Sequence, residues 1–421
     1  MTSTALPDQE SAATPAAADP TLANHFRGYV SRVRGGDIGA LPAVLGLIVL
    51  CTVFSIMRPS FLTAANFANL FTQGAAVTLI AMGLVFVLLL GEIDLSAGFA
   101  SGVCAAVLAN VVTVLGYPWY VAVLAALLTG VVIGSTLGIL VAKIGIPSFV
   151  VTLAGFLAFQ GLVLLLMEDG SNISVRDPVL VAIANRNLPP AVGWILAGLA
   201  VAGFATVQAM RQRTRALRGL VTDPLAVVLA RVGGLAAVLS TTVYILNQER
   251  SFNTLINSLK GVPIVVPIIA VLLIAWTFVL RQTSYGRHIY AVGGNREAAR
   301  RAGINVDRIR ISVFVICSSM AAIGGIVAAS RANSVDPNTG GSNVLLYAVG
   351  AAVIGGTSLF GGKGRVLDAV LGGAVVAVID NGMGLMGYSS GVKYVVTGVV
   401  LLLAASVDAL SRRRAAASGG R

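Results

Sequence analysis

Long apolar runs separated by shorter polar intervals make up most of the chain after residue 37. About twelve of these runs approach the 20 residues that a helix needs to cross the hydrocarbon core of a bilayer. The predicted spans are 38–57, 67–90, 96–115, 119–142, 147–167, 191–210, 224–247, 263–281, 309–329, 344–360, 366–387 and 393–410. The pattern therefore predicts an all-α polytopic membrane protein.

Composition supports this interpretation. The chain is 57% hydrophobic and only 11% charged, whereas a soluble globular domain carries about 25% charged residues. Glycine is abundant, and small residues let helices approach closely in lipid. Gly130, Gly134 and Gly138 repeat at four-residue spacing, which predicts a face that packs against another helix.

The net charge of +12 could suggest a nucleic-acid partner, but the positions of the basic residues favour a membrane topology. When the spans alternate, 21 of the 29 Lys and Arg fall on the side of the N-terminus and seven on the other side, with Arg231 inside a span. Basic residues near membrane segments stay in the cytoplasm. We therefore expect both termini to be cytoplasmic and expect no nucleic-acid partner.

The polar ends of the chain should contribute nothing to the core. Residues 1–37 are rich in Ala, Thr and Pro and end in several arginines, which predicts a disordered, basic cytoplasmic tail. Residues 411–421 predict a second basic cytoplasmic tail. The transmembrane domain then extends over 38–410, and it includes an inward-facing polar loop at 282–308.

This loop has the sequence of an ordered element rather than of a plain connector. Gly293 and Gly294 permit a turn, and Asn295 can cap a helix that begins directly after it. The next seven residues favour helix, and Gly303 should end it. We therefore expect a short helix on the inner membrane face.

Acidic residues at the edge of an apolar run are the first candidates for a transport path. Glu92 and Asp94 lie in Gly-Glu-Ile-Asp-Leu-Ser, where ionised groups are costly and often mark a path, a partner or an ion. Alternatively, Asp94 or Ser96 caps the following span. The stretch 91–98 also shares glycine and leucine positions with 355–362, so both predict an irregular backbone near the membrane.

A second polar pair, Asp380 and Asn381, falls inside a predicted span. Such side chains should face the bundle interior or a water-filled cavity, where they could bind the hydroxyl groups of a sugar. The alternative is an interhelical hydrogen bond, or a position near the outer surface if the apolar run is shifted.

No catalytic, nucleotide or metal site is expected in the chain. The stretch 356–364 resembles a phosphate-binding loop, but Thr357 replaces its first glycine and Gly364 replaces the Ser or Thr that would hold magnesium. The cysteines lie singly within apolar runs, which indicates core residues rather than disulfides or metal ligands. We therefore expect neither an enzyme nor a cofactor in this chain.

Four motifs together resemble the permease subunits of sugar-type ABC importers. They are Gly91-Glu-Ile-Asp-Leu-Ser-Ala-Gly98, Pro147-Ser-Phe-Val-Val-Thr-Leu-Ala-Gly155, the loop from Gly286 to Ile304, and Ile354 to Gly362 with Asp380-Asn-Gly-Met383. They are most similar to the xylose-type members of the ribose/xylose branch. The resemblance implies a ten-helix core and identifies 190–247 as an inserted helical hairpin.

The resemblance also implies partners and roles. The loop would dock on a separate ABC ATPase, which would hold ATP and magnesium, and an extracytoplasmic sugar-binding protein would deliver a monosaccharide, most plausibly a pentose such as xylose. The permease would be a homodimer in the bacterial inner membrane. The residues that this assigns to ATPase coupling are Gly286, Arg287, Gly293, Gly294, Asn295, Glu297, Ala298, Ala299, Gly303 and Ile304.

A different class of transporter remains open at this point. An ion-coupled secondary transporter could use Glu92, Asp94 or Asp380 as a proton or cation site. A membrane scaffold without transport activity would explain neither these acids nor the glycine-flanked loop.

Overall fold

The computed structural model describes residues 39–167, 170–251 and 258–418, so the whole of the predicted N-terminal tail, 1–37, lies outside the described residues. The elements are α2 Leu41–Met57, the 3₁₀ turn η1 Pro59–Leu62, α3 Ala64–Leu89, α4 Ala97–Ala109, α5 Trp119–Ile139, α6 Ser148–Leu166, β1 Ile173–Ser174, α7 Pro178–Asn185, α8 Pro190–Leu217, α9 Leu225–Leu246, α10 Val265–Gln282, α11 Ser284–Gly294, α12 Arg296–Arg301, α13 Val306–Ala332, β2 Ser334–Val335, α14 Ser342–Ile354, α15 Val366–Leu385 and α16 Ser390–Ser418. α4 and α5 each continue into a π-helical turn, Asn110–Val114 and Leu140–Ile144.

Each of the predicted spans corresponds to one of these helices. Among the described residues, nine helices are long and apolar enough to cross a membrane, and α2, α14 and α16 contain shorter apolar stretches. The only sheet in this part of the chain is one antiparallel pair of two-residue strands, β1 and β2. The all-α polytopic class is therefore confirmed.

One predicted boundary was wrong, and one helix was not predicted. The span predicted at 344–360 ends at Ile354, because Gly355 ends the helix and Gly356 turns the backbone at φ +114°. Residues 355–365 are therefore irregular. The polar loop 282–308 contains two helices, α11 and α12, where one was expected.

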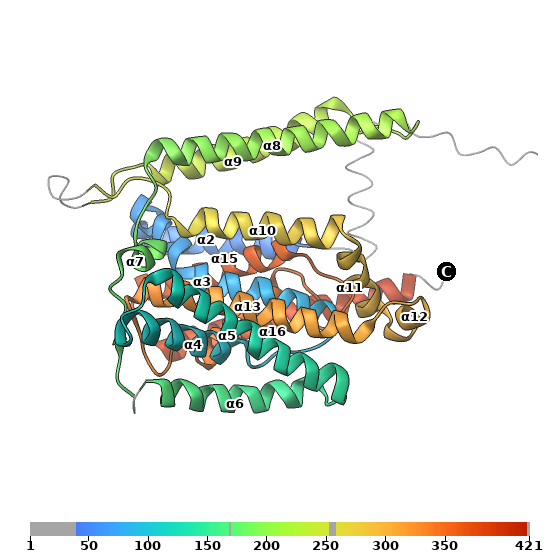
Figure 1. Ribbon diagram of the computed structural model, residues 1–421. Helices are drawn as coiled ribbons and strands as arrows, with labels where there is room; N and C mark the ends of the chain where they lie inside the picture. The colour runs from blue at the N-terminus through green and yellow to red at the C-terminus, as the bar shows by residue number, and fades with distance from the viewer. Residues whose placement is uncertain (1–38, 168–169, 252–257, 419–421) are drawn as a thin grey trace, which may run out of the picture.

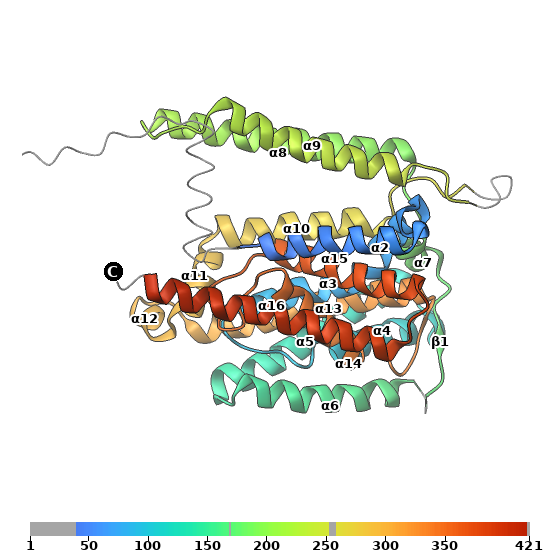
Figure 2. The same cartoon turned by 180° about the vertical axis from the view of Figure 1, so that it is seen from behind.

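The helices run between two distinct ends of the molecule, seen in Figures 1 and 2. One end carries α11 and α12 and is called here the coupling end. The other carries α7 and the β1–β2 pair and is called the strand end. Thr63 caps α3 at the strand end, and α3 then runs to the coupling end. α13 runs the opposite way and ends at β2.

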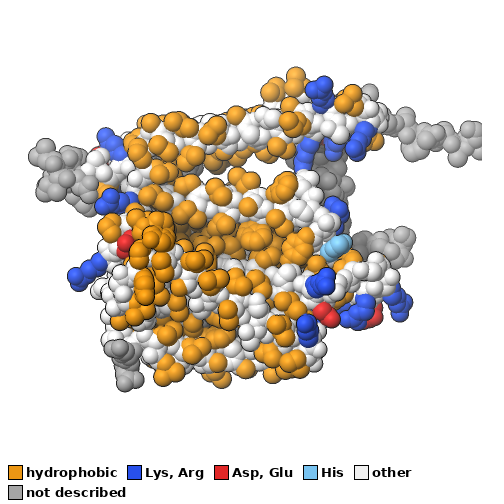
Figure 3. Space-filling model, in the orientation of Figure 1, with side chains coloured by type: hydrophobic (Ala, Val, Ile, Leu, Met, Phe, Trp, Pro, Cys, Tyr) orange, Lys and Arg blue, Asp and Glu red, His pale blue; other side chains and the backbone are white. Residues whose placement is uncertain are grey.

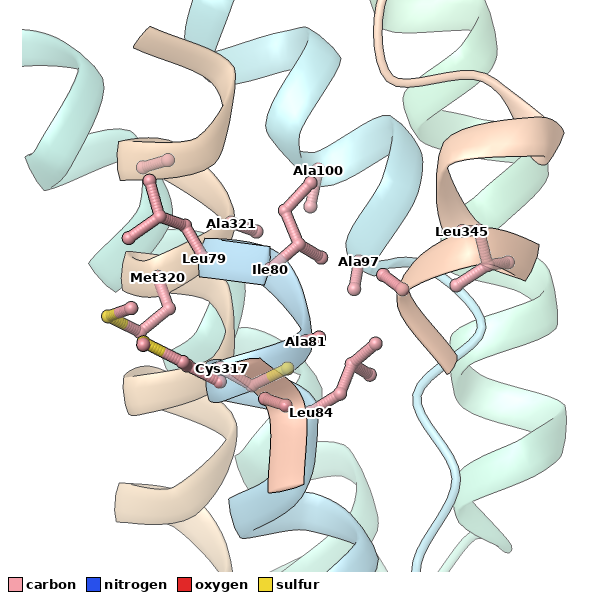
Figure 4. Packing of buried hydrophobic residues seen from close by; sticks show 14 of the residues in the cluster. Leu79, Ile80, Ala81, Leu84, Ala97, Ala100, Cys317, Met320, Ala321 and Leu345 are labelled. Carbon is pink, nitrogen blue, oxygen red and sulfur yellow. The ribbon is translucent and has the colours of Figure 1, made fainter. Parts of the chain in front are cut away.

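The core lies around α3 and α13, and Figure 4 shows its side chains interlocking with α4 and α14. Leu79, Ile80 and Leu84 of α3 are almost completely buried against this cluster. The glycines of α5 pack on α13 as predicted. A Cβ at Gly134 would lie 2.5 Å from the Phe314 carbonyl oxygen, so only glycine permits this approach.

The α8–α9 hairpin lies at the periphery, as Figures 1 and 2 show. In the most apolar 18-residue stretch of each of these two helices, only 11% of the residues are buried. Val243 and Leu246 of α9 form a small separate cluster with Val262, against Phe67 and Phe71 of α3. The hairpin therefore touches the bundle chiefly near the strand end.

Candidate functional site

Three segments that are far apart in the sequence meet at the coupling end. They are the end of α3, the end of α11 and the glycine turn at 360–362. The amide of Gly362 donates to the Leu89 carbonyl oxygen at 2.8 Å. A Cβ on Gly293 would lie 1.8 Å from that same oxygen. We call this contact of Leu89, Gly293 and Gly362 the glycine junction.

The glycine turn also meets the backbone after α3. Gly91 and Gly361 both have positive φ angles, +68° and +85°. A Cβ on Gly361 would lie 2.9 Å from both the Gly91 nitrogen and the Gly293 oxygen. An L side chain would therefore be strained and would also meet backbone atoms that cannot move away.

Glu92 also lies at the coupling end, where it forms ion pairs with two arginines. Its Oε1 accepts hydrogen bonds from Arg296 at 2.8 Å and from Arg310 at 2.7 and 3.0 Å. The Glu92 side chain is 6% exposed, that of Arg310 14% and that of Arg296 42%. A buried carboxylate needs such partners, so Glu92 binds α12 and the start of α13 to the end of α3.

The two short helices have one anchored face and one free face. Asn295 accepts a hydrogen bond from the Ala298 amide at 2.9 Å and caps α12 as predicted. Gly303 follows with φ +81°. Ala299 is buried, whereas Glu297 and Ala298 are exposed. The exposed side of α12 is free to contact another protein.

α11 is fixed by tyrosines. Tyr285 shares a 2.7 Å hydrogen bond with Ser312 of α13, and Tyr290 donates to the Gly364 carbonyl at 2.8 Å. Burial raises the pKa of both phenols, so both stay protonated. Gly286 packs on the backbone of Leu280. The turn between α10 and α11 is therefore tight.

The structure brings most of the predicted coupling residues to this end. Gly286, Gly293 and Ala299 face the protein, and Ile304 is half-buried. The exposed members are Arg287, Gly294, Asn295, Glu297, Ala298 and Gly303. Their role in coupling stays a prediction.

The loop after Glu92 is held by α6. Asp94 accepts hydrogen bonds from the amide and hydroxyl of Ser96, at 2.9 and 2.6 Å. The Ser96 side chain therefore does not cap α4. Thr152 of α6 donates to the Ile93 carbonyl at 3.2 Å, and the Ile93 amide donates to Ser148 at 3.4 Å. Ser148 and Thr152 of α6 thus hold the backbone of the loop that contains Asp94 in place.

A second polar cluster lies toward the strand end. Asp380 accepts a hydrogen bond from Gln73 of α3 and one at 3.2 Å from Lys393 of α16. Asn381 donates to Gln73 at 3.2 Å. Asp380 and Asn381 therefore form interhelical hydrogen bonds, which is one of the interpretations that the sequence left open. A role in a path is compatible with this arrangement and stays a prediction.

Sequence reasoning did not identify four residues of these two clusters as site residues: Arg296, Arg310, Gln73 and Lys393. Arg310 and Gln73 did carry a signal, because each is a polar residue in a predominantly apolar helix. Such residues in a span need a partner. Their partners are distant in the sequence, so the pairing itself was not predictable.

Comparison with known proteins gives concordant results. Residues 66–405 match the family described as the branched-chain amino acid transport system / permease component. The chain is 37% identical to the xylose transport system permease protein of Escherichia coli K12, over 84% of this chain and 87% of that protein. It is 34% identical to the xylose transport system permease protein of Haemophilus influenzae, over 88% of this chain and 96% of that protein.

A ribose import permease protein of Escherichia coli K12 is 31% identical, over 87% of this chain and 92% of that protein. These relatives are sugar transport permeases, and a permease is a transport protein rather than an enzyme. No solved structure matches the chain.

Proposed function

Because the chain belongs to the family of branched-chain amino acid transport system permease components, with sugar permeases among its relatives, we propose that it is the membrane subunit of an ABC importer for a monosaccharide. The proposed substrate is a pentose such as xylose. This choice rests on identities of 37% and 34% with xylose permeases, against 31% with a ribose permease.

The proposal rests chiefly on the attachment of α12 to the transmembrane helices. Its exposed face offers a docking surface, while Arg296 binds Glu92 just after α3 and the neighbouring α11 packs on Leu89 through Gly293. A partner that moves α12 therefore moves α3 as well. In this mechanism, a separate ATPase closes on ATP, α12 transmits the displacement, and the bundle changes between outward and inward access.

The proposed assembly contains two copies of this chain, an ATPase at the coupling end and an extracytoplasmic sugar-binding protein at the strand end. ATP and magnesium would bind to the ATPase and not to this chain. The coupling end would then face the cytoplasm of the bacterial inner membrane, with both termini on that side.

ATP-driven uptake in proteoliposomes tests the proposal. The assembly is reconstituted with its binding protein, and uptake of labelled xylose is measured for Ala298→Trp and for the control Ala216→Trp. Ala216 is also exposed, but it lies in the α8–α9 hairpin. We expect at least a tenfold loss of uptake for Ala298→Trp alone, with unchanged insertion.

Equal uptake by both variants would contradict the coupling role of α12. The same vesicles distinguish the alternative class of transporter. If uptake needs no ATP and collapses when an ionophore is added, the chain is an ion-coupled secondary transporter, in which Asp380 would be the first residue to test.

A further inference from the structure

Two cavities lie along the crevice between α10 and α15, and they share one wall residue. The cavity nearer the coupling end has a volume of about 180 Å³ and is lined by Arg281, Arg365 and Tyr290 together with apolar side chains. The other has a volume of about 380 Å³ and is lined almost entirely by apolar side chains of α2, α3, α10 and α15. Leu273 of α10 lines both.

One face of α10 runs through both cavities. Ala270, Leu273 and Thr277 recur at intervals of three and four residues, and Arg281 follows one turn later. Residues at this spacing share one side of a helix. The two cavities therefore lie one after the other along this face of α10, an apolar groove beside the middle of the helix and a basic pocket at its C-terminal end.

The basic pocket has a surplus of positive charge. Arg365 is bound to Asp368 by hydrogen bonds of 2.9 and 3.1 Å. Arg281 forms no ion pair within the part of the chain that the structure describes, and Tyr290 donates its hydroxyl to Gly364. Counting Asp368, the pocket carries one net positive charge, which favours an anion.

The apolar groove favours an apolar ligand over water, because its walls offer water almost no hydrogen-bond partners. A basic pocket between transmembrane helices binds lipid headgroups when it lies at the membrane surface. We propose that the α10–α15 crevice binds one anionic phospholipid, with its phosphate at Arg281 and an acyl chain in the groove past Leu273.

The lipid would contact elements that the proposed transport mechanism uses. Tyr290 of α11 lines the basic pocket, and the groove is lined by α3 and α15. A bound lipid would therefore stabilise the packing of α10 and α11 on these helices. The inference does not rest on the proposed function, since it needs only a bilayer around the helices.

Native mass spectrometry of the full-length chain in mild detergent tests the proposal. The delipidated protein is titrated with phosphatidylglycerol or phosphatidylethanolamine. We expect one phosphatidylglycerol to bind preferentially. Arg281→Gln should weaken it about tenfold, the order of one charge-assisted contact. Ala374→Phe, which fills the groove, should weaken binding of both lipids.

Two matched controls should leave binding unchanged. Arg213→Gln removes an exposed arginine of the hairpin, and Ala275→Phe adds the same bulk on α10 outside the two cavities. Soluble glycerol 3-phosphate distinguishes a lipid from a free phosphate, and it should not compete.

Several results would overturn the proposal. One is equal binding of the two lipids by the wild-type chain, and another is competition by glycerol 3-phosphate at the affinity of the lipid. A change of oligomeric state in Ala374→Phe without a change in lipid binding would assign the groove to a second copy of the chain instead.

Discussion

At the scale of single residues, Glu92 is the centre of the coupling end because it accepts from two arginines on separate elements. Removing one partner of a buried ion pair leaves the other charge without compensation, which costs far more than losing an exposed pair. The two arginines differ in exposure, so their substitutions should differ as well.

We therefore expect a graded series. Glu92→Gln and Arg310→Gln should each lower the free energy of unfolding by about 3 kcal/mol. Arg296→Gln should lower it by less than about 1 kcal/mol, because that side chain is 42% exposed. Thermal unfolding of the three variants in detergent measures whether their losses of stability follow this order. Equal effects of Arg296→Gln and Arg310→Gln would refute the assignment of Glu92 as a buried counterion.

Gly293 and its neighbour provide a second test with a built-in control. In Gly293→Ala, the new Cβ meets the Leu89 carbonyl, so we expect a loss of about 1–3 kcal/mol, typical of overpacking. Gly294→Ala meets no atom within 4 Å and should fold normally. Unfolding midpoints and uptake measured side by side check this. A harmless Gly293→Ala would mean that the junction opens freely.

At the scale of elements, the sequence predicted the helices because a long apolar run has few alternatives in a membrane. It missed where α14 ends, because Leu359 and Phe360 extend the apolar run past the break at Gly355 and Gly356. It missed α11 because a short interfacial helix buries only Gly286, Ile289 and Val292.

Contacts between elements were less predictable than the elements. Glu92 and Arg310 are separated by 218 residues, and no local pattern relates them. The same holds for Asp380 and Gln73, which are 307 apart. Local sequence determines which segments are helical, whereas pairing depends on how the whole bundle packs.

The α8–α9 hairpin should be removable. Leu188 donates to the Val262 carbonyl at 2.8 Å, and Asn187 pairs with Pro263 in an antiparallel bridge. The two ends of the excision are thus already adjacent. Joining Leu188 to Val262 through a two-residue glycine linker should leave a monodisperse protein with a slightly lower unfolding midpoint. Size-exclusion chromatography measures this, and aggregation would show that the hairpin belongs to the core.

At the scale of the whole molecule, the two ends differ in charge. Figure 3 shows Lys and Arg side chains on both sides of an apolar band, with more of them on the side where α11 and α12 lie. This asymmetry predicts that the coupling end faces the cytoplasm.

Labelling of introduced cysteines tests the orientation. Ala298→Cys at the coupling end should react with a membrane-impermeant maleimide only after cells are opened, whereas Ser389→Cys at the strand end should react in intact cells. The natural Cys104 and Cys317 are buried, so a chain with Cys51→Ala gives the background. The reverse labelling pattern would show that the coupling end faces outward, and it would rule out the docking of a cytoplasmic ATPase on α12.

α3 connects the two polar clusters of the protein. It carries Gln73, bound to Asp380, near one end and Leu89 of the glycine junction at the other. The helical stretch between them is roughly 24 Å long, and a buried helix of this length tilts as a rigid rod. In the proposed mechanism, an ATPase that displaced the Leu89 end of α3 would therefore also tilt the Gln73 end, so a movement made on one side of the membrane would reach the other side.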